Sequence, residues 1–108
     1  MNQAEAMQLL QNAQTQAQRL NQIGRPATAI ITSFTPLGVN VNGNNPAATL
    51  LVKVMPPDAA PFDSKLHGVF AATGLHKYQP GKEVFVKYDP VDTSVVAIDY
   101  SKAEVSQT

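Results

Sequence analysis

Hydrophobic residues in the first 22 positions repeat with the spacing of one helical face. Five of them, here called the helix stripe, are separated by four, three, four and three positions: Ala6, Leu10, Ala13, Ala17 and Leu20. Residues 2–22 contain seven Gln and no Gly or Pro, and Gln, like Ala and Leu, loses little side-chain freedom in a helix. Gly24 suits the position that follows a helix, and Pro26 cannot continue one. The pattern therefore predicts a helix over residues 3–22.

The helix stripe is a candidate interface with two interpretations. In one, the stripe docks on the body of its own domain, and in the other it meets a second copy in a dimer or small bundle. Alanines permit close approach but bury little area. At ~25 cal/mol per Å², a stripe of this length does not sustain an isolated coiled coil. The helix thus needs a partner surface, which the sequence does not name.

After Pro26 the hydrophobic period shortens to two, the period of a strand. β-Branched and aromatic residues gather in runs that are separated by turn residues, at 35–38, 42–46, 79–82 and 89–94. The predicted strands are 27–34, a short 39–41, 48–55, 62–70 or 62–72, 83–88 and 95–100. In the strand over 83–88, the alternation of Val84, Val86 and Tyr88 with Phe85 and Lys87 predicts one dry face and one wet face.

Short strands joined by tight turns favour antiparallel neighbours over βαβ units. The expected fold is mainly β (α+β): a small five- to six-stranded antiparallel barrel or roll, similar to the oligonucleotide-binding (OB) barrel, with an N-terminal α-helix. The expected organisation is a Gln/Ala-rich helix over 1–23, a barrel domain over 24–100 and a flexible tail over 101–108.

Composition narrows the functional classes. The 108 residues include no Cys, which excludes a disulfide framework, a thiolate zinc site and a Cys nucleophile. Eight basic and eight acidic side chains give a formal net charge of zero, so no broad field attracts nucleic acid or anionic lipid. The chain shows neither the basic, apolar pattern of a secretory signal nor an apolar run of about 18 residues. We therefore expect a soluble, cytoplasmic protein without a membrane span.

Residues with catalytic or metal-binding chemistry are few and scattered. His67 and His76 are nine positions apart with only Asp63 as a nearby acid, which is too little for a metal site, and each is expected in or near a loop. The serines lack the GxSxG elbow, and the glycines form no phosphate loop. Asp89 and Asp92 lie in a predicted turn, where Asp caps backbone N–H groups. We therefore assign no catalytic, cofactor-binding or metal-binding residue and expect no cofactor.

Lysines interleaved with aromatic residues raise one alternative, a single-stranded nucleic-acid-binding barrel. The lysines are Lys65, Lys77, Lys82 and Lys87, and the aromatic residues are Phe62, Phe70, Tyr78, Phe85 and Tyr88. Residues 24–100 hold six basic and six acidic side chains, however, so aromatic rings in a core and lysines in solvent explain the pattern better. The expected function is a non-enzymatic protein-interaction module whose partner is another protein or a second copy. An enzyme that works through His67 or His76 is a third possibility, for which no substrate suggests itself.

Several short motifs occur in a fixed order along the chain: GRPATA at 24–29, VNG at 41–43, VMPP at 54–57, PF at 61–62, PGKEVFVKYDP at 80–90 and VVAID at 95–99. This outline resembles a group of short uncharacterised bacterial domains with a G-x-P-A-x-A first strand and a late P-G-x-x-V-x-V-x-Y-D-P strand. The likeness covers residues 24–99. It implies a small β-barrel of a kind that often accompanies membrane or helical segments, and it supplies no catalytic residues.

Overall fold

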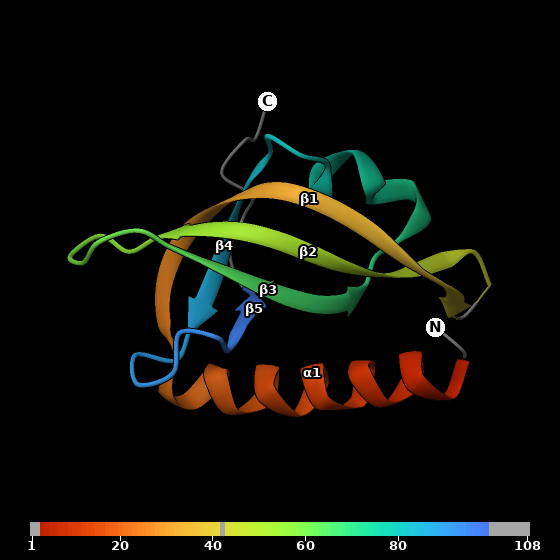
Figure 1. Cartoon of the computed structure of the whole chain (residues 1–108), viewed down its shortest axis with the longest axis horizontal. Coiled ribbons are helices and arrows are strands. Elements are labelled where there is room, and N and C mark those ends of the chain that lie inside the picture. The colour runs from red at the N-terminus through yellow and green to blue at the C-terminus, as the bar shows by residue number, and fades with distance from the viewer. Residues whose placement is uncertain (1–2, 42, 100–108) are drawn as a thin grey trace.

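Five strands form one sheet that curls into a nearly closed barrel, with a helix lying along its side (Figure 1). The structure, a computed structural model, describes residues 3–41 and 43–99. The elements in chain order are α1 (Gln3–Ile23), β1 (Arg25–Val41), β2 (Asn45–Met55), β3 (Phe62–Val69), the 3-10 helix η1 (Ala72–Tyr78), β4 (Glu83–Tyr88) and β5 (Val96–Ile98). A five-stranded antiparallel barrel with an N-terminal helix is the predicted fold, and it is confirmed.

The strand order across the sheet is β3-β2-β1-β4-β5, and every hydrogen-bonded pair is antiparallel. Four antiparallel steps separate β3 from β5, so these two end strands run in the same direction. They lie close together without a ladder between them in the described residues, and we call this gap the seam. Near one end of the seam, the Ser64 Oγ donates a hydrogen bond of 3.0 Å to the carbonyl oxygen of Thr93.

The inward-facing residues of all five strands fill the barrel. On β4 the predicted alternation is confirmed, because Val84, Val86 and Tyr88 are buried while their neighbours are half-buried. Ile31, Leu50 and other aliphatic residues of β1 and β2 join them in one core. At one end of the barrel η1 packs Leu75 and Tyr78 against this core. The sequence did not predict η1.

The turn predicted at 35–38 is wrong, because β1 continues through it. The pairing of β1 with β2 shifts register between Pro36 and Asn40, and it is regular again up to the hairpin. Pro36 has no N–H to donate, and Gly38 has a φ of 86°. These residues therefore produce a bulge in a long strand, and the separate strand predicted at 39–41 is the end of β1.

Other predicted boundaries move by a few residues. β2 begins at Asn45, because the chain turns at Gly43 and Asn44 and residues 45–47 then pair with β1 and β3. β3 ends at Val69, after which the Phe70 N–H bonds to the carbonyl oxygen of Pro46 at 3.0 Å. The last strand, predicted over 95–100, spans Val96–Ile98. Residue 100 and the predicted tail over 101–108 lie outside the described residues.

Helix α1 docks on its own barrel, as the first interpretation of the helix stripe predicted. It lies across the seam and contacts both β3 and β5. Leu20 is buried, and the Arg19 Nη2 donates to the Asp89 Oδ2 at 2.9 Å, which ties the end of the helix to the loop after β4. The helix ends at Ile23, and the N–H of the following Gly24 bonds to the carbonyl oxygen of Leu20 at 2.8 Å. A Cβ at this position would lie 2.5 Å from that oxygen, which explains the glycine.

Candidate functional site

Asp89, from the late YDP motif, joins three parts of the chain. Its Oδ1 accepts hydrogen bonds from the backbone N–H groups of Val91 (2.8 Å) and Asp92 (3.3 Å), and its Oδ2 accepts the Arg19 bond. The Val91 N–H, the Arg19 guanidinium and the Asp92 N–H together hold the pKa of Asp89 below its usual value, although burial opposes them. Because both carboxylate oxygens of Asp89 accept hydrogen bonds, from the loop and from the helix, Asp89 anchors the one to the other. The interpretation of Asp89 and Asp92 as turn residues is confirmed.

The two histidines lie on different elements. His67 is a half-buried residue of β3, so its expected place in or near a loop is wrong, while His76 is exposed in η1. The Nδ1 of His67 and the Oγ1 of Thr49 are 2.7 Å apart, a hydrogen bond between cross-strand partners. Burial, followed by the charge of Lys65, lowers the pKa of His67 and so favours its neutral form. In the described part of the chain no three His, Asp or Glu residues gather to hold a metal ion.

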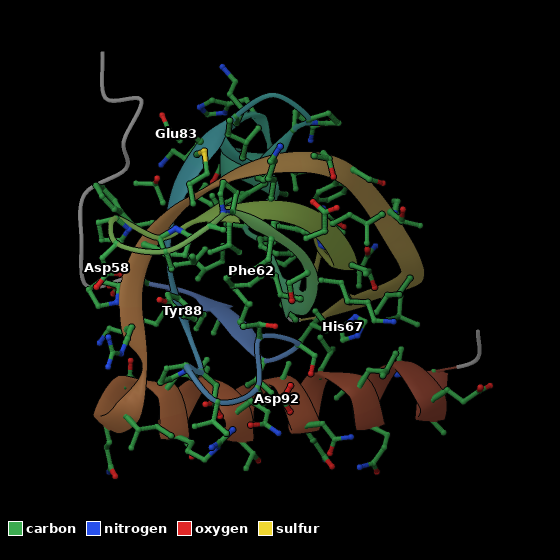
Figure 2. The ribbon with its side chains drawn as sticks, turned by 60° about the vertical axis from the view of Figure 1, so that its left-hand side comes forward. Asp58, Phe62, His67, Glu83, Tyr88 and Asp92 are labelled. Carbon is green, nitrogen blue, oxygen red and sulfur yellow. The ribbon has the colours of Figure 1, made fainter. Side chains whose placement is uncertain are left out.

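The aromatic rings are mostly part of the core. The Phe62 and Tyr88 rings meet edge to face at 5.4 Å inside the barrel (Figure 2), and Phe70 packs against Tyr78 at 4.7 Å. Phe85 differs, because it lines a shallow hollow on the outside of β4 together with Pro26 and Met55. The expectation of core aromatic residues beside solvated lysines therefore describes most of this set.

One face of the barrel is covered by neither helix. It is the outer surface of β1, β2 and β3, here called the sheet face, and it looks toward the viewer in Figure 1 between α1 and η1. Leu51 lies at its centre with 45% of its surface exposed, opposite Ser33 on β1 and Lys65 on β3. Lys53, the next outward residue of β2, pairs with Asp63. The sheet face is thus aliphatic at its centre, with charges of both signs around it.

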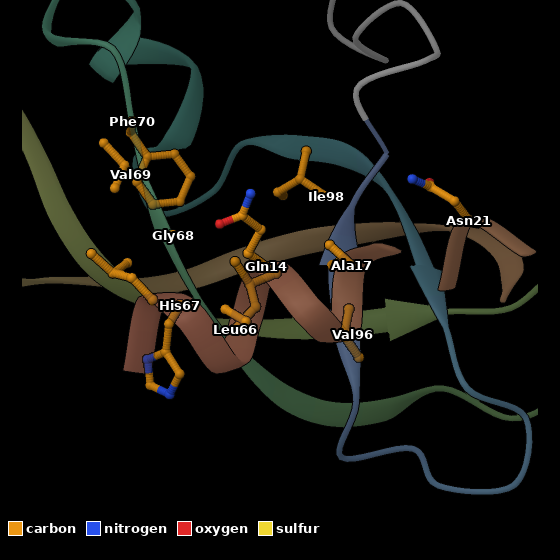
Figure 3. A pocket seen from close by; sticks show the side chains of 13 residues that line it. Gln14, Ala17, Asn21, Leu66, His67, Gly68, Val69, Phe70, Val96 and Ile98 are labelled. Carbon is orange, nitrogen blue, oxygen red and sulfur yellow. The ribbon is translucent and has the colours of Figure 1, made fainter. Parts of the chain in front are cut away.

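A crevice of about 450 Å³ lies between α1 and the seam (Figure 3). It is lined by residues of α1 (Leu10, Ala13, Gln14, Ala17, Asn21), of β3 and its end (Leu66, His67, Gly68, Val69, Phe70) and of β5 (Val96, Ala97, Ile98). None of these thirteen residues is an Asp, Glu, Lys or Arg. The Gln14 side chain points into the crevice, while the His67 ring points away from it (Figure 3).

The helix stripe is divided between two roles. Ala6 and Leu20, near its ends, are buried. Leu10, Ala13 and Ala17, in its middle, line the crevice. The sequence had indicated these five residues as an interface, but it missed the strand residues opposite them. The small residues Gly68 and Ala97 could have indicated the opposite wall of the crevice. They do so only when it is known that β3 and β5 are the two end strands of the sheet.

Comparison of the chain with family models, with curated proteins and with solved structures finds no match. The resemblance to short bacterial barrel domains therefore stays a prediction. Within the described residues, no helix has the length and apolar character needed to cross a membrane.

Proposed function

We propose that this chain is a non-enzymatic module that binds another protein through the sheet face. The observation that carries the proposal is Leu51, a large aliphatic side chain held in the open at the centre of a β-sheet and bordered by Lys53 and Lys65. A lone exposed leucine is ordinary, but one framed by charges of both signs has the anatomy of a small interface, apolar inside and polar at its rim.

The topology supports the use of this face. A meander of β1, β2 and β3, in which β1 also pairs with β4, is similar to the strand arrangement of the five-stranded, partly open OB barrel, and this similarity supports the proposal. Barrels of that type bind their ligands on the face of the second and third strands. Because one fold serves many functions, the ligand class has to be argued from the side chains of the face.

Those side chains favour a protein over a single-stranded nucleic acid. Bases bind to such barrels by stacking on exposed aromatic rings along a basic groove. Here Phe62, Phe70 and Tyr88 pack in the core. The positive charges of Lys53 and Lys65 are accompanied by Asp63 on β3 and by Glu83, which lies opposite Ile30. The nearest ring on the outer surface is the half-buried Phe85 of β4, and one ring beside charges of both signs suits a partner of mixed polarity better than a row of stacked bases.

Three of the polar side chains that could perform chemistry, Asp89, His67 and Asp92, have local structural partners, which supports a non-enzymatic role. Asp89 holds a loop and a helix, and His67 bonds to Thr49. The Oδ1 of Asp92 accepts bonds from the N–H (3.1 Å) and the Oγ (2.6 Å) of Ser94. None of these groups is directed at a common point where a substrate would react.

Photo-crosslinking of the full chain in the cells that produce it tests the proposal. A benzophenone side chain in place of Leu51 is expected to form discrete protein adducts, one of which has twice the chain mass if the partner is a second copy. The same group in place of Val91, which is 93% exposed on the β4–β5 loop, reports random encounters. Lys53→Glu together with Lys65→Glu is expected to weaken the adducts at position 51, because they reverse the charge of the rim.

Two results would contradict the proposal. One is an adduct pattern at position 51 that equals the pattern at position 91 or ignores the charge reversals. The other is micromolar binding of a fluorescent single-stranded oligonucleotide that weakens steeply with added salt, since that is the signature of phosphate contacts. This second result would favour the nucleic-acid alternative.

A further inference from the structure

The crevice under α1 exists because small residues face one another across it. In its middle the helix contributes the methyl groups of Ala13 and Ala17 beside Leu10 and Gln14, and the strands contribute the small residues Gly68 and Ala97. At the end of the helix the side chain of Leu20 is fully buried against the barrel. The docked elements therefore leave a mostly apolar space of about 450 Å³ between them, which is open to solvent on one side.

The lining determines what chemistry the space accepts. Its polar side chains are the amides of Gln14 and Asn21 and the His67 imidazole, which is bonded to Thr49 and turned outward. The remaining lining residues are aliphatic or aromatic, apart from Gly68. A charged group placed among them would lose its hydration without a counter-charge, which is costly. The occupant is therefore uncharged along the part that enters.

The shape of the crevice determines what form the occupant takes. The lining residues of α1 run from Leu10 to Asn21 along one helical face. Leu10 and Asn21 are eleven positions apart, which is about 16 Å along a helix, so the crevice is long rather than round. A zigzag of carbon–carbon bonds about 1.5 Å long covers this distance with roughly a dozen atoms. The volume agrees, because a cavity of about 150 Å³ already holds a benzene molecule.

We propose that the crevice is a binding site for a linear aliphatic chain of roughly ten to twelve carbons, such as an acyl or alkyl group. The chain lies between α1 and the seam, along Ala13 and Ala17 on one side and Val96 and Ile98 on the other. Its head group stays in solvent at the open side, so the site selects the chain and not the head. This site is separate from the sheet face, so the proposal does not depend on the proposed protein partner.

Calorimetric titration of the full chain with dodecan-1-ol and with sodium dodecanoate, both below their aggregation concentrations, tests the site. Both probes are expected to bind, with a negative heat-capacity change, and to raise the melting temperature, because they bind the folded state. Butan-1-ol, which has the head group of dodecan-1-ol and a short chain, is the ligand control and is expected to bind at least about tenfold more weakly.

A variant whose side chains fill the crevice is the second test of the site. Ala13→Leu combined with Ala17→Leu puts aliphatic side chains where the ligand chain would lie, and it is expected to weaken dodecan-1-ol binding by at least about tenfold without lowering the melting temperature. Ala4→Leu makes the same change on the exposed side of α1 and is expected to bind as the unchanged chain does. Binding that the double variant retains, or no binding of either twelve-carbon probe, overturns the proposal.

A second measurement decides the matter if the double variant does not fold. The chain has no Cys, so Ala17→Cys introduces a single thiol inside the crevice and Ala4→Cys a single thiol outside it. Dodecan-1-ol is expected to slow alkylation of the thiol at position 17 and to leave that at position 4 unchanged. Equal alkylation rates at position 17 with and without dodecan-1-ol overturn the proposal.

Discussion

Replacing Leu20 by Ala measures how firmly α1 is attached to the barrel. Leu20 is 1% exposed, so the substitution removes buried methyl and methylene groups at the helix–barrel interface. The loss of three such groups costs about 2.4 kcal/mol in transfer free energy at ~0.8 kcal/mol each, and the cavity left behind adds to it. Alanine gains a few tenths of a kcal/mol in helix propensity, roughly 0.2. The expected decrease in the free energy of unfolding is about 3 kcal/mol.

Urea unfolding followed by circular dichroism and by tyrosine fluorescence provides the assay. We expect a single transition at a lower midpoint, an unchanged slope with urea, and a melting temperature lower by about 10–20 °C. Ile23→Ala is the matched control, because Ile23 lies on the same helix but is 49% exposed. Its expected effect is within about 0.5 kcal/mol, the usual range for surface positions.

The result that would refute this reasoning is a Leu20→Ala chain whose free energy of unfolding equals that of Ile23→Ala. A helical signal that disappears at lower urea than the sheet signal would also refute it, because the helix would then not belong to the cooperative unit of the barrel. Either outcome would favour a helix that is free of its own domain. That is the condition under which the helix stripe could meet a second copy.

Three further predictions concern the helix end and the titrating groups. Asp89→Asn removes the charge partner of Arg19 and is expected to lower the free energy of unfolding above pH 4. The difference from the wild-type chain should close as pH falls below about 3.8, because the pKa of Asp89 is lowered in the folded chain and the stabilisation by its carboxylate is lost there. Urea unfolding between pH 2.5 and 6 measures this difference. Because the pKa of His67 is lowered in the folded chain, the unfolded chain takes up the proton first as pH falls. The free energy of unfolding should therefore decrease below about pH 6.5. His67→Gln should make the melting temperature less dependent on pH in melts between pH 7.5 and 5. Gly24→Ala brings a Cβ within 2.5 Å of the Leu20 carbonyl oxygen and is expected to lower the free energy of unfolding by about 1–3 kcal/mol in urea unfolding.

Local chemistry made much of the fold predictable. The helix follows from its apolar spacing and its Gly–Arg–Pro end, and β4 from a strict alternation that the barrel buries on one side. The turn at Gly43, between β1 and β2, has a φ of 96°, which few residues other than glycine adopt readily. In each case the residues of one short segment determine its local structure, so no knowledge of distant contacts is needed.

The missed features depend on partners that lie far along the chain. Pro36 and Gly38 have the same chemistry in a turn as in a bulge, and only the continued pairing with β2 distinguishes the two. The seven-residue η1 has no capping side chain and no helical repeat, so its sequence looks like loop, and packing of Tyr78 on Phe70 holds it in place. The crevice needs three elements at once, because it exists only where α1 crosses the two ends of the sheet.

The position of α1 also explains why a barrel this small tolerates an incomplete closure. Open sheet edges expose backbone N–H and C=O groups that pair readily with other chains, and proteins cover or shorten such edges. Here β5 is only three residues long, while the longer edge of β3 faces α1 across the seam. The alanines of the helix stripe let α1 cover both edges and keep the crevice, so one arrangement protects the sheet and forms the proposed site.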